Sequence, residues 1–536
     1  MLIWFKKQFR DHPLRSIIVL AFFVRLIAVF FAKGYMMHDD HFLTIEPSGS
    51  WAAGKNFNDW MPGIGNNNPH PEPISFFYLG FLFVFFKIFY FFGIDNPDTQ
   101  MYIIRFLQAC YSLLIVYYGY KITEILSNKK NAAQVGILLA LIAILPNFSV
   151  RNLVEMVCIP PLMIGFYHLL RGVRLKNSRI GGVEFSSPVN AEMPNRSSEI
   201  KGLMIAAILM GLAVGVRFQT GLLVALVGLV LLFQSNFKNA FIFGVVSFAA
   251  FFVTQLDDVL LWGGEPFQHL KGYFEYNKLH ANDYPGSPFA YLSFIGIFIL
   301  PPVSLFLLFG FFRSWKKYLL IFLPILGFLL FHILYPNKQE RFILPALPFV
   351  VMLGVIGWNE FVTSSAFWQN RKSLLRGCWV FFWSLNTLAM LVLCFTYAKK
   401  NRVESMLYLY EQNDCRNFAL EFSHSEGGSM MPQFYSGEWT NYYTWNRDAK
   451  PEEDMLNFKH NEEVTSNDLQ PRLEPNYFLF YEGDRLDERI AAVKKYYPSL
   501  TYNATIYAGW FDEVLHSLNP KNTLETIQVY KVEGQQ

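Results

Sequence analysis

Long apolar segments alternate with short charged linkers along most of this chain, and that pattern restricts the possible folds more than any other feature. About 20 consecutive apolar residues are enough for a helix to cross a bilayer. The apolar segments lie near residues 14–33, 74–93, 101–126, 131–149, 152–171, 202–216, 218–234, 237–256, 291–312, 317–335, 341–360 and 376–397. The sequence therefore predicts a polytopic α-helical membrane protein with membrane lipids around it.

The composition agrees with a membrane protein that also has soluble mass. Of the 536 residues, 53% are hydrophobic and 16% are charged, whereas a soluble protein has about 25% charged residues. The net charge of +3 gives no reason to expect nucleic acid as a partner. Five scattered cysteines show neither a disulfide framework nor the spacing of metal ligands.

Basic linkers orient the apolar segments, because cytoplasmic loops carry an excess of Lys and Arg. If segment 74–93 crossed the membrane, the basic stretch at 128–130 would fall outside. If 74–93 does not cross, every basic linker lies inside. We take the second arrangement, which predicts about eleven transmembrane helices, the N-terminus inside and the C-terminus outside. It also predicts two large external loops, at 34–100 and 257–290.

The chain changes character near residue 398, where polar sequence replaces the apolar segments. We predict a transmembrane domain over 1–398 and an extracytoplasmic soluble α/β domain over 399–536. Alternating apolar runs indicate strands, and apolar residues at helical spacing indicate helices. The strands are expected at 476–481, 500–507 and 526–532, and the helices at 486–496 and 510–518.

Charged residues gather just after the first apolar segment. They are His38, Asp39, Asp40, His41 and Glu46. Ionisable groups beside a membrane segment are costly and usually functional. A carboxylate there can accept a proton from a hydroxyl, and neighbouring like charges would raise its pKa toward a useful value. A divalent metal site, an ion pathway and a plain solvated loop are the alternatives.

The turn at 336–342 carries Lys338 and Arg341 on the expected outer side, against the usual charge bias. Both side chains suit a phosphate, Arg as a planar fork and Lys as a point charge. Arg217, between two apolar segments on the same side, is a third candidate for phosphate binding. An ion pair closing the hairpin is the alternative for the turn, and snorkelling to the interface is the alternative for Arg217.

Other polar residues on the outer side are candidates for substrate binding. Arg151 and Glu155 lie four residues apart and could instead pair on one helix face. The loop at 257–290 begins with Asp257, contains His280, and has aromatic residues that suit a sugar face or a lipid headgroup. An interfacial helix is the alternative for this loop.

These motifs together resemble the GT-C glycosyltransferases. The resemblance rests on Asp39-Asp40 after the first helix, Arg151-Asn152-Leu153-x-Glu155, Tyr284-Pro285-Gly286-Ser287-Pro288, and Asn337-Lys338-Gln339-Glu340-Arg341-Phe342-Ile343-Leu344-Pro345. The chain is most similar to the dolichyl-phosphate-mannose-dependent mannosyltransferases of GPI-anchor and N-glycan assembly. That family shows His-Pro-Asp-Glu in the first loop, where this chain has His38-Asp39-Asp40-His41, and His-Lys-Glu-x-Arg-Phe near the later turn. The resemblance spans roughly 14–360 and supplies no counterpart for the C-terminal domain.

The resemblance implies an external active site, a polyprenyl-phosphate sugar as donor, and inversion at the anomeric carbon. Asp39 matches the family's catalytic aspartate and Asp40 the acid beside it. The acceptor would be an extracytoplasmic glycan or glycolipid. The lipid-linked sugar is a substrate, so no cofactor and no metal are expected. The sugar would be mannose or another hexose.

The predicted function is a lipid-phosphate-sugar-dependent glycosyltransferase. Asp39 and Asp40 are the predicted catalytic residues, and Lys338, Arg341 and Arg217 the predicted phosphate ligands. The remaining predicted substrate-binding residues are Glu46, Arg151, Glu155, Asp257 and His280. A secondary transporter and a non-catalytic membrane binding subunit are the other classes. The expected location is a bacterial inner membrane with a periplasmic active site, or else the ER membrane with a lumenal one.

Overall fold

A computed structural model of the chain resolves two compact units, which are described separately. The residues described are 8–55, 75–173, 175–180, 183–185, 196–260, 264–283, 285–422, 430–437, 439, 442–446, 474–520 and 525–534. The helical unit covers Met1–Phe30, Pro71–Tyr78 and Arg105–Phe395, and the sheet unit covers Phe31–His70, Leu79–Ile104 and Thr396–Gln536, within those described residues. The predicted domain boundary at 398/399 stays a prediction.

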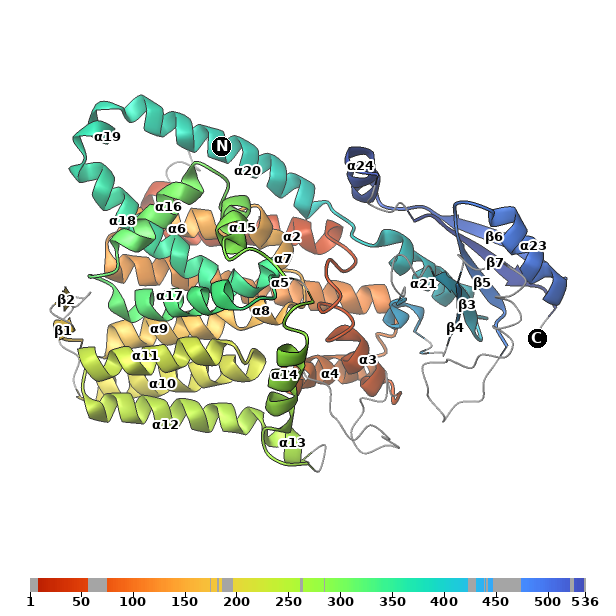
Figure 1. The fold of residues 1–536 in the computed structure, drawn as a ribbon, viewed down its shortest axis with the longest axis horizontal. Coiled ribbons are helices and arrows are strands. Elements are labelled where there is room, and N and C mark those ends of the chain that lie inside the picture. Colours follow the sequence, from red (N-terminus) through yellow and green to blue (C-terminus); the bar gives the residue numbers. More distant parts are fainter. Residues whose placement is uncertain are drawn as a thin grey trace. The chain divides into compact units, whose positions relative to one another are not determined.

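The helical unit is a bundle of apolar helices, drawn from red through teal in Figure 1. Its elements are α2 (Pro13–Phe31), α6 (Lys129–Leu141), α7 (Ile144–Phe148), α8 (Val154–Val157), α9 (Ile159–Gly172), β1 (Ser178–Ile180), β2 (Val183–Phe185), α10 (Arg196–Val216), α11 (Thr220–Gln234), α12 (Phe237–Thr254), α13 (Leu256–Leu260), α14 (Gln268–Leu279), α15 (Ala290–Ile299), α16 (Val303–Arg313), α17 (Leu319–Leu334), η2 (Glu340–Ala346), α18 (Leu347–Ser364), α19 (Ala366–Asn370) and α20 (Lys372–Cys394). Helices α4 (Phe76–Phe91) and α5 (Pro97–Leu126) have residues in both units.

Among the described residues, seven helical stretches are long and apolar enough to cross a membrane, and the bent pair α15–α16 would make eight. Helices α4, α11 and α17 are apolar but shorter. The predicted segments at 218–234 and 317–335 are two of these shorter helices, and 74–93 is the third. Segment 131–149 is instead divided into α6 and α7. The chain is thus an integral membrane protein, and the count of eleven crossings stays a prediction.

Close backbone approach brings α16 and α18 together. A Cβ atom on Gly310 would lie 2.0 Å from the carbonyl oxygen of Gly354, so a larger residue has no room there. In a membrane the hydrophobic effect does not drive helices together, because lipid tails are as apolar as the side chains. Small residues at a crossing let the backbones approach closely and pack by van der Waals contact. In the same unit α10 packs between α9 and α12, and the three run side by side in Figure 1.

The division between α6 and α7 leaves backbone carbonyls without helical partners, and Arg25 of α2 covers them. Its guanidinium donates to the carbonyls of Ala140 at 3.2 Å and Leu139 at 3.3 Å, and to the hydroxyl of Ser112 at 2.8 Å. Arg25 is 1% exposed. A buried arginine is therefore part of the fold's backbone hydrogen bonding.

Asn386 of α20 covers the other side of the same break. Its amide oxygen accepts from the backbone N–H of Ala143 at 2.9 Å, and its amide nitrogen donates to the carbonyl of Leu141 at 2.7 Å. One side chain thus supplies the acceptor and the donor that these two backbone groups would have found in a continuous helix. Side chains from the first and last long helices of this unit thus bind the same break.

The sheet unit contains a five-stranded mixed sheet in the order β4-β3-β5-β7-β6. Strand β3 is parallel to β4 and β5, whereas β7 is antiparallel to β5 and β6. Its elements are α3 (Ile45–Ala52), α21 (Lys400–Gln412), β3 (Phe418–Phe422), η3 (Gln433–Ser436), β4 (Tyr443–Asn446), β5 (Tyr477–Tyr481), α23 (Leu486–Tyr496), β6 (Leu500–Ile506), α24 (Trp510–Leu518) and β7 (Ile527–Val532). The three strands and two helices predicted for the C-terminal region are confirmed.

Helix α23 covers one face of the sheet. Ile490 and Val493 pack with Phe478, Phe480 and other apolar residues of the strands. All five residues of β5 are buried, so both faces of this central strand are covered. A strand buried on both faces reads as a continuous apolar run rather than an alternating one, which is what NYFLFY shows.

The chain just after α2 joins the chain just after α20 within the sheet unit. Gly34 forms a parallel bridge with Ala398, and the N–H of Ala398 donates to the carbonyl of Lys33 at 3.1 Å. Gly34 has φ +71°, and a Cβ atom there would lie 1.9 Å from the carbonyl oxygen of Ala398. Only glycine fits both the backbone conformation and the close approach. The first loop and the C-terminal region therefore share one unit.

Gly34→Ala should lower the free energy of unfolding by more than the cost of placing alanine at a positive φ. A non-glycine residue at positive φ costs about 1–2 kcal/mol, and the clash with Ala398 adds to that cost. Gly54→Ala is the matched control, since Gly54 has φ +76° but no atom within 4 Å of its would-be Cβ. Thermal unfolding in detergent should show a drop in midpoint for Gly34→Ala at least twice that for Gly54→Ala. Equal drops would contradict the tight pairing.

Candidate functional site

The two acids of the first loop lie in the sheet unit and differ in burial. Asp40 is 3% exposed, and its carboxylate accepts from the backbone N–H of Met36 at 3.2 Å. The hydroxyl of Thr44 donates to the carbonyl of Asp40 at 2.9 Å, which closes the turn that leads into α3. Asp39 is only half-buried. Asp39 is therefore the more accessible of the two predicted catalytic acids, and Asp40 is tied into the loop.

Glu46 and His41 form a fully buried pair beside these acids. The Nε2 atom of His41 lies 2.8 Å from Oε1 of Glu46. The same carboxylate accepts from the backbone N–H of Phe434, at 3.0 and 3.2 Å to its two oxygens. Burial raises the pKa of Glu46, while the bonds to His41 and Phe434 oppose that rise. Glu46 thus joins the first loop to the C-terminal region, and its predicted contact with substrate stays a prediction.

Aromatic rings hold His41 in place. Its imidazole stacks on Tyr35, with ring centroids 5.1 Å apart, and on Tyr435, with centroids 5.5 Å apart. Tyr435 belongs to η3, which packs against α3. Sequence reasoning did not find this part of the site, because the run Met431 to Ser436 has no periodicity that marks it as structured.

The cationic turn lies in the helical unit, and Lys338 serves there as a helix cap. Its ammonium donates to the carbonyls of His332 and Ile333, both at 2.9 Å, and to the carbonyl of Tyr335. His332 and Ile333 lie in the last turn of α17, where carbonyls have no intrahelical partner, and Tyr335 follows the end of the helix. Burial lowers the pKa of Lys338. The three N–H donors of Lys338 are therefore engaged in this structure.

Arg341 follows in η2 and faces a carboxylate that it shares with Arg217. Nη1 of Arg217 lies 2.7 Å from Oε1 of Glu155, and Nε of Arg341 lies 3.6 Å from the same oxygen. Each of the three side chains is less than 10% exposed. The ring of Phe342 lies beneath both guanidinium groups, 5.2 Å from Arg217 and 5.6 Å from Arg341. Two predicted phosphate ligands thus meet, with one net positive charge among the three groups.

The alternative role given to Arg151 and Glu155, a pair on one helix face, does not occur. Helix α8 begins at Val154, so Arg151 lies before the helix and the two do not occupy one helix face. Glu155 instead pairs with Arg217, 62 residues further along the chain. Arg151 is buried, at 3% exposure. Its predicted contact with substrate stays a prediction.

The second large loop meets the cationic turn. Pro285 forms an antiparallel bridge with Asn337, and the N–H of Gly286 lies 3.4 Å from the carbonyl of Pro336. The second large loop and the cationic turn thus lie side by side. Tyr284 and Trp262, which also belong to this loop, lie outside the described residues.

Histidines in the second loop have acidic partners. His280 lies 2.8 Å from Asp283, and both are exposed. His269 pairs with Asp258, and both are fully buried. Asp257, the predicted substrate ligand, lies next to Asp258 in α13. The sequence did not single out His269, although an acid pair followed by a histidine is the signal that could have found it.

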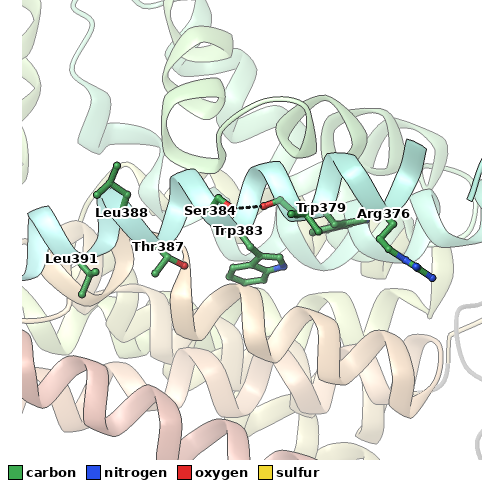
Figure 2. Close-up of a pocket in the computed structure, with 8 residues that line it drawn as sticks. Arg376, Trp379, Trp383, Ser384, Thr387, Leu388 and Leu391 are labelled. Carbon is green, nitrogen blue, oxygen red and sulfur yellow. Dashed lines mark hydrogen bonds between the residues drawn. The ribbon is translucent and has the colours of Figure 1, made fainter. Parts of the chain in front are cut away.

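An apolar groove of about 660 Å³ lies along α20, and no predicted site residue lines it. Figure 2 shows the side chains that line it, from Arg376 through Trp379 and Trp383 to Leu391. All of them belong to one helix, and Ser384 there donates to the carbonyl of Val380. A groove that one helix forms by itself on an apolar surface suits surrounding lipid rather than a reaction.

Within the described part of the chain, no group of three His, Cys, Asp or Glu side chains could hold a metal ion. His38 and His41 were the metal candidates in the sequence. The ring of His38 stacks on Phe42, with centroids 4.6 Å apart, and His41 is paired with Glu46.

Two solved membrane enzymes have the same fold. ArnT from Cupriavidus metallidurans bound to undecaprenyl phosphate gives a TM-score of 0.55 at 12% identity, over 98% of this chain and 99% of that chain. The Archaeoglobus fulgidus oligosaccharyltransferase gives 0.51 at 12% identity, over 89% of this chain and 70% of that one. Both are GT-C glycosyltransferases, and the fold of this chain is of that class. The ArnT match also extends through the C-terminal region, which thus has a structural counterpart.

A family model gives the particular assignment. The model of the Alg9-like mannosyltransferase family matches residues 16–421, so the chain belongs to that family. The protein is therefore a membrane glycosyltransferase. No curated protein matches the chain.

Replacing Glu46 should loosen the first loop. Glu46→Ala would leave His41 and the N–H of Phe434 buried without their acceptor, and losing one partner of such a pair costs about 3–5 kcal/mol. Glu46→Gln keeps an acceptor and should cost less than half as much. Thermal unfolding in detergent measures both, and equal losses for the two variants would contradict the hydrogen-bonding role.

The same pair should make stability depend on pH. The raised pKa means that the folded protein holds the Glu46 proton more tightly than the unfolded chain does. Stability should therefore fall as the pH rises from the ordinary pKa of 4.5 toward the raised one. The difference between wild type and Glu46→Gln isolates this effect, and a difference that is constant over that range would contradict it.

Proposed function

We propose that this protein transfers mannose or another hexose from a polyprenyl-phosphate sugar to an extracytoplasmic glycan or glycolipid, with inversion at the anomeric carbon. The observation that carries the proposal is the buried cluster in which Arg217 and Arg341 share the carboxylate of Glu155, so that the three groups sum to one positive charge. A buried site with surplus positive charge suits a phosphate. The fold neighbour ArnT, whose structure holds undecaprenyl phosphate, supports a lipid-phosphate donor.

Asp39 is the proposed general base, with Asp40 as its alternative. The base removes the proton from an acceptor hydroxyl while that oxygen forms a bond to the anomeric carbon. The bond from this carbon to the phosphate oxygen breaks, and its electron pair stays with the phosphate. The half-buried position of Asp39 supports this choice, because a base must reach its substrate, whereas Asp40 is buried against the N–H of Met36.

The proposed leaving group is a lipid phosphate that gains one negative charge as the bond breaks. Cations fixed beforehand in a buried site stabilise such developing charge more than they would in water. Arg217 and Arg341 have this role in the proposal. Lys338 is the third proposed phosphate ligand, and it would exchange at least one of its carbonyl contacts at the end of α17 for the phosphate. Arg151, Asp257 and His280 remain proposed contacts to the sugars. The reaction is proposed to occur on the periplasmic side of a bacterial inner membrane, or else in the ER lumen, without a cofactor.

Asp39→Asn should lower kcat by about 10²–10⁴-fold, which is the contribution of a general base. Asp40→Asn should have a smaller effect, because Asn can still accept from Met36. Asp95→Asn is the control, since Asp95 is an exposed acid elsewhere in the first external loop. Sugar transfer from polyprenyl-phosphate mannose by purified protein measures all three.

Full activity of Asp39→Asn together with loss in Asp40→Asn would move the role of base to Asp40. Full activity of both variants would remove the single-base mechanism. The assay is run in EDTA, and a requirement for added Mg²⁺ or Mn²⁺ would contradict the proposal that no metal takes part.

Lys338→Ala separates the two roles of this residue. If Lys338 binds the donor phosphate, the KM for the donor should rise about tenfold, since a hydrogen bond to a charged group contributes about 1.5–3 kcal/mol. If Lys338 only caps α17, the unfolding midpoint should fall while the KM stays unchanged. We expect the rise in KM, and an unchanged KM would restrict the phosphate site to the two arginines.

A further inference from the structure

We infer that Glu155 is an internal anion that occupies the phosphate site when no phosphate is bound. In the protein without substrate, its carboxylate pairs with the arginines. When the donor binds, the carboxylate moves away and the donor phosphate pairs with the arginines. This inference rests on the proposed function, because it concerns the same phosphate site.

The geometry shows that Arg217 is only partly satisfied by Glu155. One nitrogen of Arg217 hydrogen-bonds to Oε1 of Glu155, whereas its buried Nε and Nη2 have no hydrogen-bond partner among the described residues. The Oε2 atom of Glu155 is likewise buried without such a partner. A guanidinium group has five N–H donors in a fork that matches two oxygens of a phosphate. A phosphate can therefore satisfy donors that the single carboxylate leaves unused.

The surrounding elements fix the arginines but leave the carboxylate on a short segment. Arg217 lies at the junction of α10 and α11, where its backbone N–H donates to Ala213 and its carbonyl accepts from Thr220. Arg341 lies in η2, and its Nη2 donates to Oε1 of Gln339 at 2.5 Å. Glu155 belongs to α8, which is one turn long. The backbone of Glu155 is held as well, because α9 follows α8 directly and the carbonyl of Glu155 accepts from Sγ of Cys158. Its carboxylate is bonded to Arg217 through Oε1 alone, so a rotation of this side chain is enough to release the arginine.

The charges explain why such an anion is useful. The two arginines and Glu155 sum to one positive charge, and a phosphodiester donor brings one negative charge. The released lipid phosphate carries up to two negative charges, so Glu155 opposes the product more strongly than the donor. The three side chains are almost fully buried, so this opposition is little screened by water. The same carboxylate would therefore neutralise part of the buried positive charge before the donor binds. It would also assist release of the product by repelling the lipid phosphate.

A purely structural ion pair is the competing role, and it makes the opposite prediction. If Glu155 only fastens α8 to the α10–α11 junction, its replacement should disturb the arginines and weaken phosphate binding. If Glu155 competes with phosphate, its replacement should tighten phosphate binding. The sign of the change in affinity therefore separates the two roles.

The experiment measures the affinity of purified full-length protein for undecaprenyl phosphate. Glu155→Gln keeps an acceptor for Arg217 but removes the charge, so we expect about tenfold tighter binding, which is about 1.4 kcal/mol. Arg217→Gln should bind at least tenfold more weakly. Glu360→Gln is the charge control and should leave the affinity unchanged, because Glu360 lies near the far end of α18 and pairs with the exposed Lys317 at 2.8 Å.

The outcomes separate this inference from the proposed function. Unchanged affinity in Arg217→Gln would overturn the phosphate site itself. Weaker binding in Arg217→Gln together with unchanged or weaker binding in Glu155→Gln would overturn only the inference about Glu155. If Glu155→Gln does not fold, a structure of the wild type with undecaprenyl phosphate decides. Phosphate bound to Arg217 with Glu155 turned away supports the inference, and an intact pair of Glu155 with Arg217 overturns it.

Discussion

Backbone groups at broken helices need hydrogen-bond partners, and in an apolar setting those partners must come from the protein itself. This requirement governs the helical unit. The division between α6 and α7 is tolerated because Arg25 covers two carbonyls there and Asn386 covers a further carbonyl and an N–H. The two side chains come from helices at opposite ends of this unit's sequence. Polar residues inside apolar segments thus have a structural role in this bundle, because they hydrogen-bond the backbone groups at the break.

The same requirement fixes two of the cations that the proposal assigns to phosphate. Helix α17 ends on carbonyls that the ammonium of Lys338 covers, and this contact shapes the turn that leads to Arg341. Arg217 lies where α10 gives way to α11. Lys338 and Arg217 thus both lie where one helix ends or gives way to the next.

The sequence predicted the C-terminal elements well and the tertiary pairs poorly. Strand β5 and helices α23 and α24 were found because their apolar patterns are strong over their whole length. The break in segment 131–149 was missed, although Pro146 lacks the N–H that would bond the carbonyl of Ile142. The acidic cluster was found from its position after the first helix. The pairs of Glu155 with Arg217 and of Glu46 with Phe434 join residues far apart in sequence, and no local pattern records them.

The hydrogen bond between Glu46 and Phe434 spans 388 residues of sequence, and this separation has a consequence for biogenesis. A ribosome adds about 5–20 residues per second, so Glu46 is synthesised roughly 20–80 seconds before its partner exists. During that interval His41 and Glu46 lack the segment that encloses them, although the apolar helices that follow have already been made. The acidic loop is thus synthesised well before it can reach its final structure. The loop that carries the proposed base therefore cannot reach its final structure until the C-terminal region has been synthesised.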